Sequence, residues 1–203
     1  MKNIYIVLLI VVVVICLHIG YVFKDSSCFE SSGVLRLEKG VIPGLSHNGS
    51  AFFDGTTFTG TVHINGSLDA RSVSFASLDV RGTALLYDCT FKMQVIILGS
   101  IKAYNCRFNE MMFINSKNMQ FDSCKIDELQ IEKNAGDNDV QTLVLQHGSK
   151  VTGPVTFESN NGEIIIDATS ECGMVTYCTY MQYYSSCMLY SKKPRVDFFG
   201  YSM

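Results

Sequence analysis

The chain has 203 residues and a formal net charge of −3, and 47% of its residues are hydrophobic, 11% aromatic and 17% charged. This apolar content excludes a mainly disordered chain, and 16 Gly with 3 Pro exclude a collagen-like one. The acidic balance argues against nucleic-acid binding, since Lys and Arg gather only at Lys192, Lys193 and Arg195.

An uncharged segment opens the chain. Residues 4–23 carry no charged side chain and lie between Lys2 and Lys24. At about 1.5 Å per helical residue this segment spans about 30 Å, the thickness of a bilayer core. We predict a transmembrane helix, with residues 1–27 as a membrane anchor or, alternatively, a cleaved signal segment. We expect residues 28–49 to form a linker or N-terminal cap.

The middle of the chain is a repeat. Apolar or aromatic residues recur at positions 53, 70, 87, 104 and 121, a constant step of 17. Within each unit the apolar residues come in pairs two apart, the alternation of strands with one buried face. Three short strands per unit, separated by Gly, Ser, Asn or Asp, predict an all-β, single-stranded parallel β-helix, with residues 50–170 forming the solenoid.

The step of 17 also predicts the core. One inner column is expected to hold Phe58, Phe75, Phe91, Phe108 and Ile126, and a second beside it Thr56, Val73, Cys89, Cys106 and Cys124. Another face is expected to bury the pairs Val62/Ile64, Leu78/Val80, Val95/Ile97, Met112/Ile114 and Leu129/Ile131. The last Cys-to-Cys step is 18, which we interpret as one inserted residue, Ser123, in a bulge at a corner.

The repeat loosens after Ile131. Residues 133–139 are polar and are expected to leave the coil as a loop. Strand patterns return at Leu143/Leu145, Val151, Val155/Phe157 and Ile164/Ile166. Together these segments predict about seven coils.

Residues 171–203 have a different composition, rich in Tyr and Cys, and contain no further copy of the repeat. We expect a cap over the last coil, because an open strand edge promotes aggregation; a partner-binding or disulfide-bonded tail is the alternative. The cysteines outside the repeat are the candidate disulfide residues, and their pairing stays open: Cys28, Cys172, Cys178 and Cys187.

Residue types suited to catalysis or metal binding do not converge in the sequence. Cys89, Cys106 and Cys124 form a straight column, whereas zinc needs ligands that surround one point, so they are expected to pack as small apolar groups. His47, His63 and His147 have no partner at a recognisable spacing. Asp54, Asp88 and Asp122, with Asn105, recur in one row and are interpreted as turn formers. We therefore expect no enzyme, cofactor or metal.

One row of aromatic residues is a candidate binding face. Tyr87, Tyr104 and Phe121 follow the step of 17 and would stand side by side on the coil surface. Such a row suits recognition of a glycan or a host protein, and alternatively covers the edge of the core.

Three stretches resemble bactofilin-type, polymer-forming β-helix proteins: FTGTVHI (58–64), VRGT (80–83) and GSKVTGPVTFE (148–158). The chain also resembles small exported β-solenoid proteins of unknown function. The first resemblance implies a right-handed β-helix that joins end to end and scaffolds the bacterial cell envelope from a membrane. The core differs from that family in its Phe, Met and Cys, and residues beyond Ser170 have no counterpart there.

We therefore expect a non-enzymatic scaffold of the bacterial inner membrane that is anchored through residues 4–23. Its β-helix is expected outside the cytoplasm, with self-association through the coil ends. The alternative is a secreted or periplasmic binding module that recognises a glycan or host protein along its coil faces.

Overall fold

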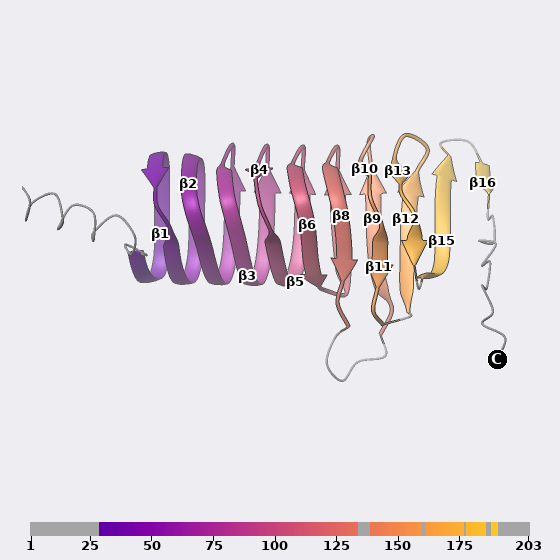
Figure 1. Ribbon diagram of the computed structural model, residues 1–203, viewed down its shortest axis with the longest axis horizontal. Helices are drawn as coiled ribbons and strands as arrows, with labels where there is room; N and C mark the ends of the chain where they lie inside the picture. Colours follow the sequence, from indigo (N-terminus) through magenta and orange to yellow (C-terminus); the bar gives the residue numbers. More distant parts are fainter. Residues whose placement is uncertain (1–28, 134–138, 160, 177, 186–187, 191–203) are drawn as a thin grey trace, which may run out of the picture.

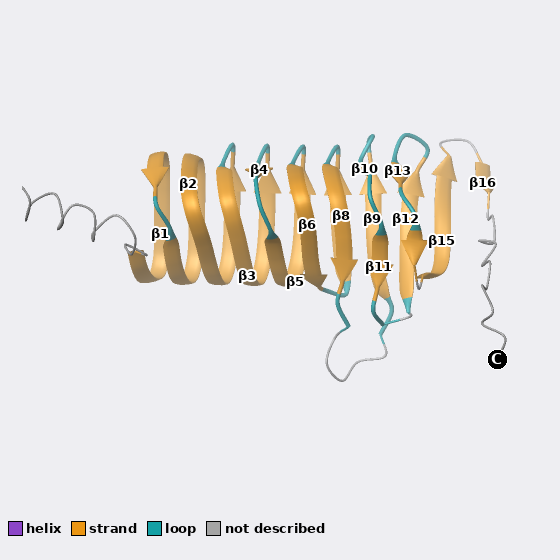
Figure 2. Ribbon diagram, in the orientation of Figure 1, coloured by secondary structure: helices purple, strands orange, loops and turns teal. Residues whose placement is uncertain are grey.

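A computed structural model describes the backbone of residues 29–133, 139–159, 161–176, 178–185 and 188–190, and the side chains up to residue 176. Every regular element in these ranges is a β-strand (Figure 1, Figure 2). The strands are β1 (Phe29–Ile42), β2 (Leu45–Arg71), β3 (Ser74–Tyr87), β4 (Thr90–Phe91), β5 (Val95–Tyr104), β6 (Arg107–Asn115), β7 (Asn118–Asp122), β8 (Lys125–Ile131), β9 (Gln141–Gln146), β10 (Lys150–Val151), β11 (Val155–Phe157), β12 (Gly162–Asp167), β13 (Glu171–Cys172), β14 (Val175–Thr176), β15 (Cys178–Ser185) and β16 (Met188–Tyr190).

The strands wind into a parallel β-solenoid of about eight turns, with a spacing of about 17 residues (Figure 1). Each coil pairs in parallel with the next, for example Phe75 with Phe91 and Leu78 with Val95. The parallel β-helix predicted from the repeat is therefore confirmed.

Each coil has three faces, named here by their inward side chains. The first face contains Val62/Ile64, Leu78/Val80 and Val95/Ile97; the second contains Leu68/Ala70, Ala84/Leu86 and Ile101/Ala103; the third contains Val73/Phe75, Cys89/Phe91 and Cys106/Phe108. Strand alternation places these residues inside and their neighbours outside.

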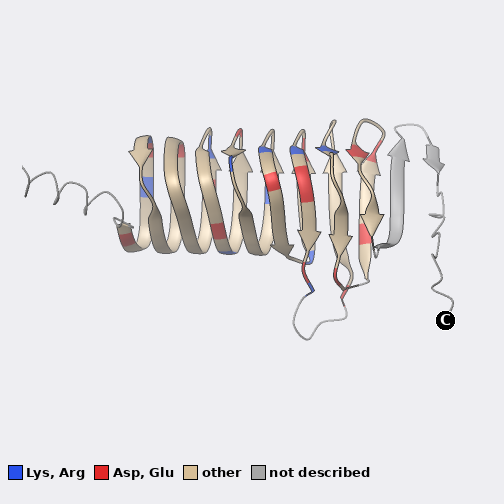
Figure 3. Ribbon diagram, viewed as in Figure 1, with Lys and Arg blue, Asp and Glu red and all other residues tan. Residues whose placement is uncertain are grey.

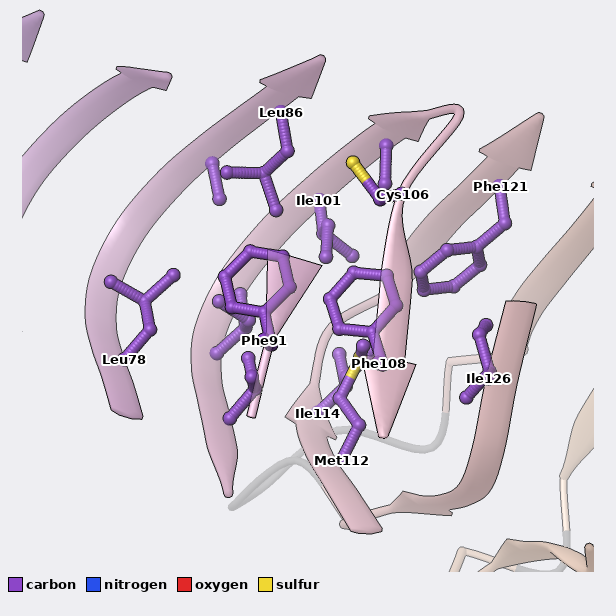
Figure 4. Packing of buried hydrophobic residues seen from close by; sticks show 14 of the residues in the cluster. Leu78, Leu86, Phe91, Ile101, Cys106, Phe108, Met112, Ile114, Phe121 and Ile126 are labelled. Carbon is purple, nitrogen blue, oxygen red and sulfur yellow. The ribbon is translucent and has the colours of Figure 1, made fainter. Parts of the chain in front are cut away.

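Both predicted columns of the third face and all predicted pairs of the first face are buried, which confirms the expected core. Figure 4 shows Phe91 and Phe108 inside the solenoid among aliphatic side chains of neighbouring coils. The rings of Phe75, Phe91 and Phe108 stack nearly parallel, with centroids 5.1 and 4.6 Å apart. A phenyl column suits a solenoid because each ring meets an identical ring one coil away.

Two corners of the coil depend on residues that tolerate positive φ. Gly49, Gly66, Gly82 and Gly99 join the first face to the second, with φ of 132 to 146°. The second corner joins the second face to the third in the left-handed region, at Gly55, Ser72, Asp88, Asn105, Ser123 and His147. Asn and Asp are the non-glycine residues that enter this region most readily.

The interpretation of Ser123 as an inserted residue is wrong. Ser123 has a φ of 56° and occupies the corner position that Asn105, with 51°, occupies one coil earlier. The extra residue lies between Asn115 and Asn118, because Leu98 pairs with Asn115 and Ile101 with Met119. The glycine column ends at this point, and a different corner replaces it.

The expected loop after Ile131 is flanked as predicted, since β8 ends at Ile131 and β9 begins at Gln141. Within it, residues 134–138 lie outside the described ranges. Gln141 closes the corner beneath the loop: its buried Nε2 donates to the carbonyls of Ser116 and Glu132, at 3.1 and 2.8 Å. The strand pairs predicted between Leu143 and Ile166 are all buried.

The solenoid extends beyond both predicted boundaries. Residues 29–42 are not a linker, because β1 pairs with β2 in continuous parallel register from Phe29/Leu45 to Ile42/Phe58. At the other end, β13, β14 and β15 continue the parallel stacking past residue 170. The last described strand, β16, pairs antiparallel to β15.

The predicted anchor, residues 4–23, lies outside the described ranges. Within those ranges, the chain contains no helix with the length and apolarity that a membrane crossing requires.

Candidate functional site

The predicted aromatic row Tyr87, Tyr104 and Phe121 is only partly correct. Tyr87 pairs with Tyr104 on adjacent coils, and both side chains point outward from the second face. Phe121 pairs with Ala103 and is fully buried, and Asp122 takes the outer position beside Tyr104. The step here is 18 because of the extra residue near Ser116, and a slip of one residue turns a strand side chain to the opposite face.

The two tyrosines form a stacked ladder rather than an open platform. Their rings are 4.9 Å apart between centroids and 10° from parallel. The guanidinium of Arg71, one coil earlier, lies 5.2 Å from the centroid of Tyr87. Both faces of the Tyr87 ring are therefore covered. A sugar that stacks on aromatic faces therefore finds no free face on Tyr87.

The cysteine column is buried, as predicted. Its thiols also make hydrogen bonds that are not evident from the sequence. The Cys106 thiol accepts the backbone N–H of Cys89 at 3.4 Å and donates to the carbonyl of Tyr104 at 3.3 Å. The Cys124 thiol accepts the N–H of Cys106 in the same way, and the Ser149 hydroxyl accepts that of Cys124. Each side chain thus satisfies a backbone amide beside the left-handed corner.

Contacts with Cys124 and Cys89, together with burial, raise the pKa of the Cys106 thiol. The neutral thiol is thereby favoured, and a reactive thiolate is not.

Of the four predicted disulfide residues, the structure describes the side chain of Cys172 alone. Cys172 lies on β13 beside Val151, half-buried at the end of the third-face column. Cys28, Cys187 and the side chain of Cys178 lie outside the described ranges, so a disulfide among these four residues stays a prediction.

Each histidine that looked isolated in the sequence has a partner one coil away. The buried His47 ring bonds the Ser31 hydroxyl and the Gly33 carbonyl, with N···O distances of 2.8 and 3.2 Å. His63 Nδ1 lies 3.3 Å from Asp79 Oδ2. His147 Nδ1 lies 2.6 Å from Asp122 Oδ2. Partners 14 to 25 residues apart become visible only when coil register is known.

Around His147 the chain forms an electrostatic cluster at the left-handed corner. The hydrogen bond with Asp122, and then the charge of that carboxylate, raise the pKa of His147. Burial opposes ionisation of Asp167, but hydrogen bonds from the His147 amide, Ser170 and Thr169 outweigh it and lower the Asp167 pKa to about 2. Both shifts favour the charged form of the residue, the imidazolium of His147 and the carboxylate of Asp167.

The predicted Asp/Asn row also divides between two columns. Asp88 and Asn105 are left-handed corner residues, as turn formers are, and Asn105 Nδ2 donates to Asp88 Oδ1 at 2.6 Å. Asp54 and Asp122 instead precede the corner and point outward. Across the part of the chain that the structure describes, no group of three or more His, Cys, Asp or Glu residues is placed to hold a metal ion.

Charged residues are scattered along the solenoid without a strong patch of one sign (Figure 3). Two surface hollows lie near its N-terminal end. The larger, about 440 Å³, is on the second face, where Arg36 pairs with Glu38 at 3.0 Å and Arg71 with Asp69 at 3.3 Å. The smaller, about 210 Å³, is on the first face and contains the His63–Asp79 pair.

Comparisons with protein-family models, with curated proteins and with solved structures find no match for this chain. The resemblance to bactofilin-type proteins therefore stays a prediction.

Proposed function

We propose that the protein is a non-enzymatic β-solenoid scaffold of the bacterial cell envelope that associates with other copies through its N-terminal coil. In this proposal, residues 4–23 form a transmembrane helix, the solenoid is right-handed and it lies outside the cytoplasm.

The observation that carries the proposal is the first coil, whose outer edge is paired with no other described strand. Phe29 occupies the same inward column as Leu45, yet Phe29 is 56% exposed and Leu45 is 0%. Leu35, Leu37 and Ile42 are likewise only partly buried, although their partners on β2 are fully buried. Among the described strands, β1 pairs with β2 alone. An uncovered strand edge beside apolar side chains favours pairing with another chain.

The opposite end favours association less. There, β16 reverses direction and pairs antiparallel to β15, which interrupts the parallel stacking of coils. A second copy that meets β1 with its own β1 would form a symmetric contact, in which the same surface serves both partners.

Sedimentation of the full-length protein in detergent over a range of concentrations tests the proposal. We expect growth in mass with concentration. Phe29→Lys, which places a charge at the open end, should weaken association at least 10-fold. Met93→Lys changes a 47% exposed side chain outside the first coil and should leave association unchanged. A monomer at every concentration would contradict self-association.

Membrane orientation needs a separate measurement. Alkaline phosphatase fused after Met203 should be active, because it folds only outside the cytoplasm. An inactive fusion, together with an active cytoplasmic reporter at the same position, would contradict the orientation.

The alternative function, recognition along the Tyr87–Tyr104 row, loses its main support because these rings stack on one another. Substitution of Tyr104 by Ala is therefore expected to affect stability more than ligand capture.

A further inference from the structure

The outward side of the first face is polar towards both ends of the solenoid and apolar in between. In coil register, one outward column contains His63, Asp79, Ile96, Phe113, Gln130 and Thr156. The column two residues further along each strand contains Asn65, Arg81, Leu98, Asn115, Glu132 and Glu158. Three apolar side chains are therefore neighbours at the centre of this face, and we name them the first-face patch: Ile96, Leu98 and Phe113.

The first-face patch is accessible from outside. Leu98 is 36% exposed, and Ile96 and Phe113 are partly exposed. Neighbouring coils hold Asp79 and Gln130 in the same column, so the coil itself does not require an apolar side chain there. Adjoining exposed apolar side chains with polar residues around them are typical of a protein interface.

Charges of opposite sign border the first-face patch. Arg81 lies one coil before it and Glu132 one coil after it, and Glu158 follows Glu132 in the same column. Within the described ranges neither Arg81 nor Glu132 forms a salt bridge. Asp79, beside Arg81, already faces His63 Nδ1 at 3.3 Å. One border is therefore available to an anion and the other to a cation.

A second copy of the same face supplies both. A two-fold axis that runs along the strands through the centre of the patch reverses the order of the coils. It places Arg81 of each copy opposite Glu132 of the other, and the apolar side chains opposite one another. Two-fold symmetry forms each of these contacts twice.

The alternative order of the coils is less favourable. If the two copies met with their coils in the same order, Glu132 and Glu158 of both copies would gather at one end of the contact. Juxtaposed like charges are repulsive. The charges therefore favour the antiparallel order.

We propose that the first face binds a second copy of this chain in antiparallel order, with the first-face patch at the centre and an Arg81–Glu132 ion pair at each border. This contact goes beyond the proposed contact between β1 edges. A symmetric β1 contact closes at a dimer, because one surface serves both partners. A second symmetric contact on a different face links such dimers into an open assembly, as a scaffold requires.

The size of the face sets the expected strength. Six coils at about 4.8 Å and five residues per strand at about 3.3 Å give an overlap of about 500 Å² for each partner. A standard stable interface buries about 800 Å² for each partner. Association through the first face alone is therefore expected to be weak, and the end contact strengthens it by raising the effective concentration.

Sedimentation of the full-length Phe29→Lys protein in detergent isolates the first-face contact. We expect a monomer–dimer equilibrium. Addition of Leu98→Lys should weaken it about 10-fold or more, because a charge is buried at the apolar centre. Phe52→Lys introduces the same charge at a 42% exposed side chain of the second face, and this matched control should leave the equilibrium unchanged.

Charge reversal tests the antiparallel order. In the same Phe29→Lys protein, Arg81→Glu and Glu132→Arg should each weaken dimerisation about 10-fold or more, because each places like charges opposite one another. The two reversals together restore opposite charges, so the dissociation constant should return to within about 3-fold of the parent value. All these side chains point outward, so thermal unfolding should show melting temperatures close to that of the parent.

The outcomes separate the first-face contact from the end contact. With Phe29 intact, Leu98→Lys should stop growth at a dimer, and continued growth would overturn the first-face contact. A Phe29→Lys protein that is monomeric at every concentration, beside a dimeric wild type, would overturn it too and leave the end contact standing. Undiminished association in Phe29→Lys would instead contradict the end contact alone. Single charge reversals without rescue in the double variant would overturn the antiparallel order.

Discussion

The glycine corner offers the sharpest test of how this solenoid is built, and Gly82→Ala is the informative change. Gly82 has a φ of 140°, which L-residues rarely adopt. A Cβ atom added there would lie 2.0 Å from the carbonyl oxygen of Gly66, one coil earlier. The contact is with backbone, so no side-chain rotation can relieve it.

The expected cost has two parts. Holding a non-glycine residue in this conformation costs about 1–3 kcal/mol. The carbonyl of Gly66 must also move by about 1 Å to reach an ordinary contact, which strains the inter-coil hydrogen bonds on either side of the corner. Loss of two such bonds costs about 1–3 kcal/mol in total. The sum is about 2–6 kcal/mol, and at about 2–4 °C per kcal/mol the melting temperature should fall by about 10 °C.

Gly55→Asn is the matched control. Gly55 has a φ of 60°, and among the described residues an added Cβ would approach only the side-chain Cγ of Lys39, at 3.4 Å. The equivalent corner positions already hold Ser72, Asp88 and Asn105 at nearly the same φ. Asn should therefore be tolerated at position 55, with a stability change of less than about 1 kcal/mol.

Thermal and urea unfolding of the full-length protein, followed by circular dichroism, measure both variants under one condition. A Gly82→Ala variant within about 1 kcal/mol of wild type would refute the argument from close backbone approach, because the predicted strain and lost hydrogen bonds exceed that value. Equal destabilisation by Gly55→Asn would refute the distinction between the two corners.

Three further predictions concern the core and the left-handed corner. Phe91→Ala removes the ring between Phe75 and Phe108 and should lower the free energy of unfolding in urea by about 3–5 kcal/mol. Phe52→Ala, at a side chain that is 42% exposed, should lower it by less than about 0.5 kcal/mol. Similar values for the two variants would contradict the stacked core. Cys106→Ser keeps a side chain that can accept the Cys89 N–H and donate to the Tyr104 carbonyl. Cys106→Ala leaves the Cys89 N–H unpaired at a cost of about 1–3 kcal/mol, so it should unfold at a lower urea concentration than Cys106→Ser. The reverse order would count against the hydrogen-bonded column. The raised pKa of His147 means that protonated His147 stabilises the fold fully below an unfolded-state pKa of about 6.5, and that this stabilisation is lost as the pH rises through the folded-state pKa. The variant His147→Asn should therefore lose less thermal stability than wild type between pH 6 and 8.5. An unchanged pH profile would refute this assignment.

The sequence alone determined the architecture and most of the core. Strand alternation is local, and a repeat step near 17 stacks like residues on like, so spacing by itself assigns Phe75, Phe91 and Phe108 to one buried column. The same reasoning placed the cysteine column correctly, because a straight line of thiols suits packing better than metal binding.

Coil register was the first feature that only the tertiary structure decided. Up to β8 the true steps vary from 16 to 18 residues, as between Phe75 and Phe91 or Phe108 and Ile126, and across the loop the step from Phe121 to Leu145 is 24. A constant step therefore placed Phe121 with the tyrosines and made Ser123 an insertion. Because side-chain direction alternates at every residue, an error of one position exchanges the inside for the outside.

The tertiary structure also decided which polar groups meet and where the solenoid begins and ends. His63 and Asp79 are 16 residues apart and lie on different coils, so no local pattern joins them. Phe29–Ile42 lacks a clear copy of the repeat, yet it forms a coil because β2 offers it a complete parallel edge. Local sequence determines strands and inward faces, whereas partner choice depends on contacts between coils that a single coil cannot encode.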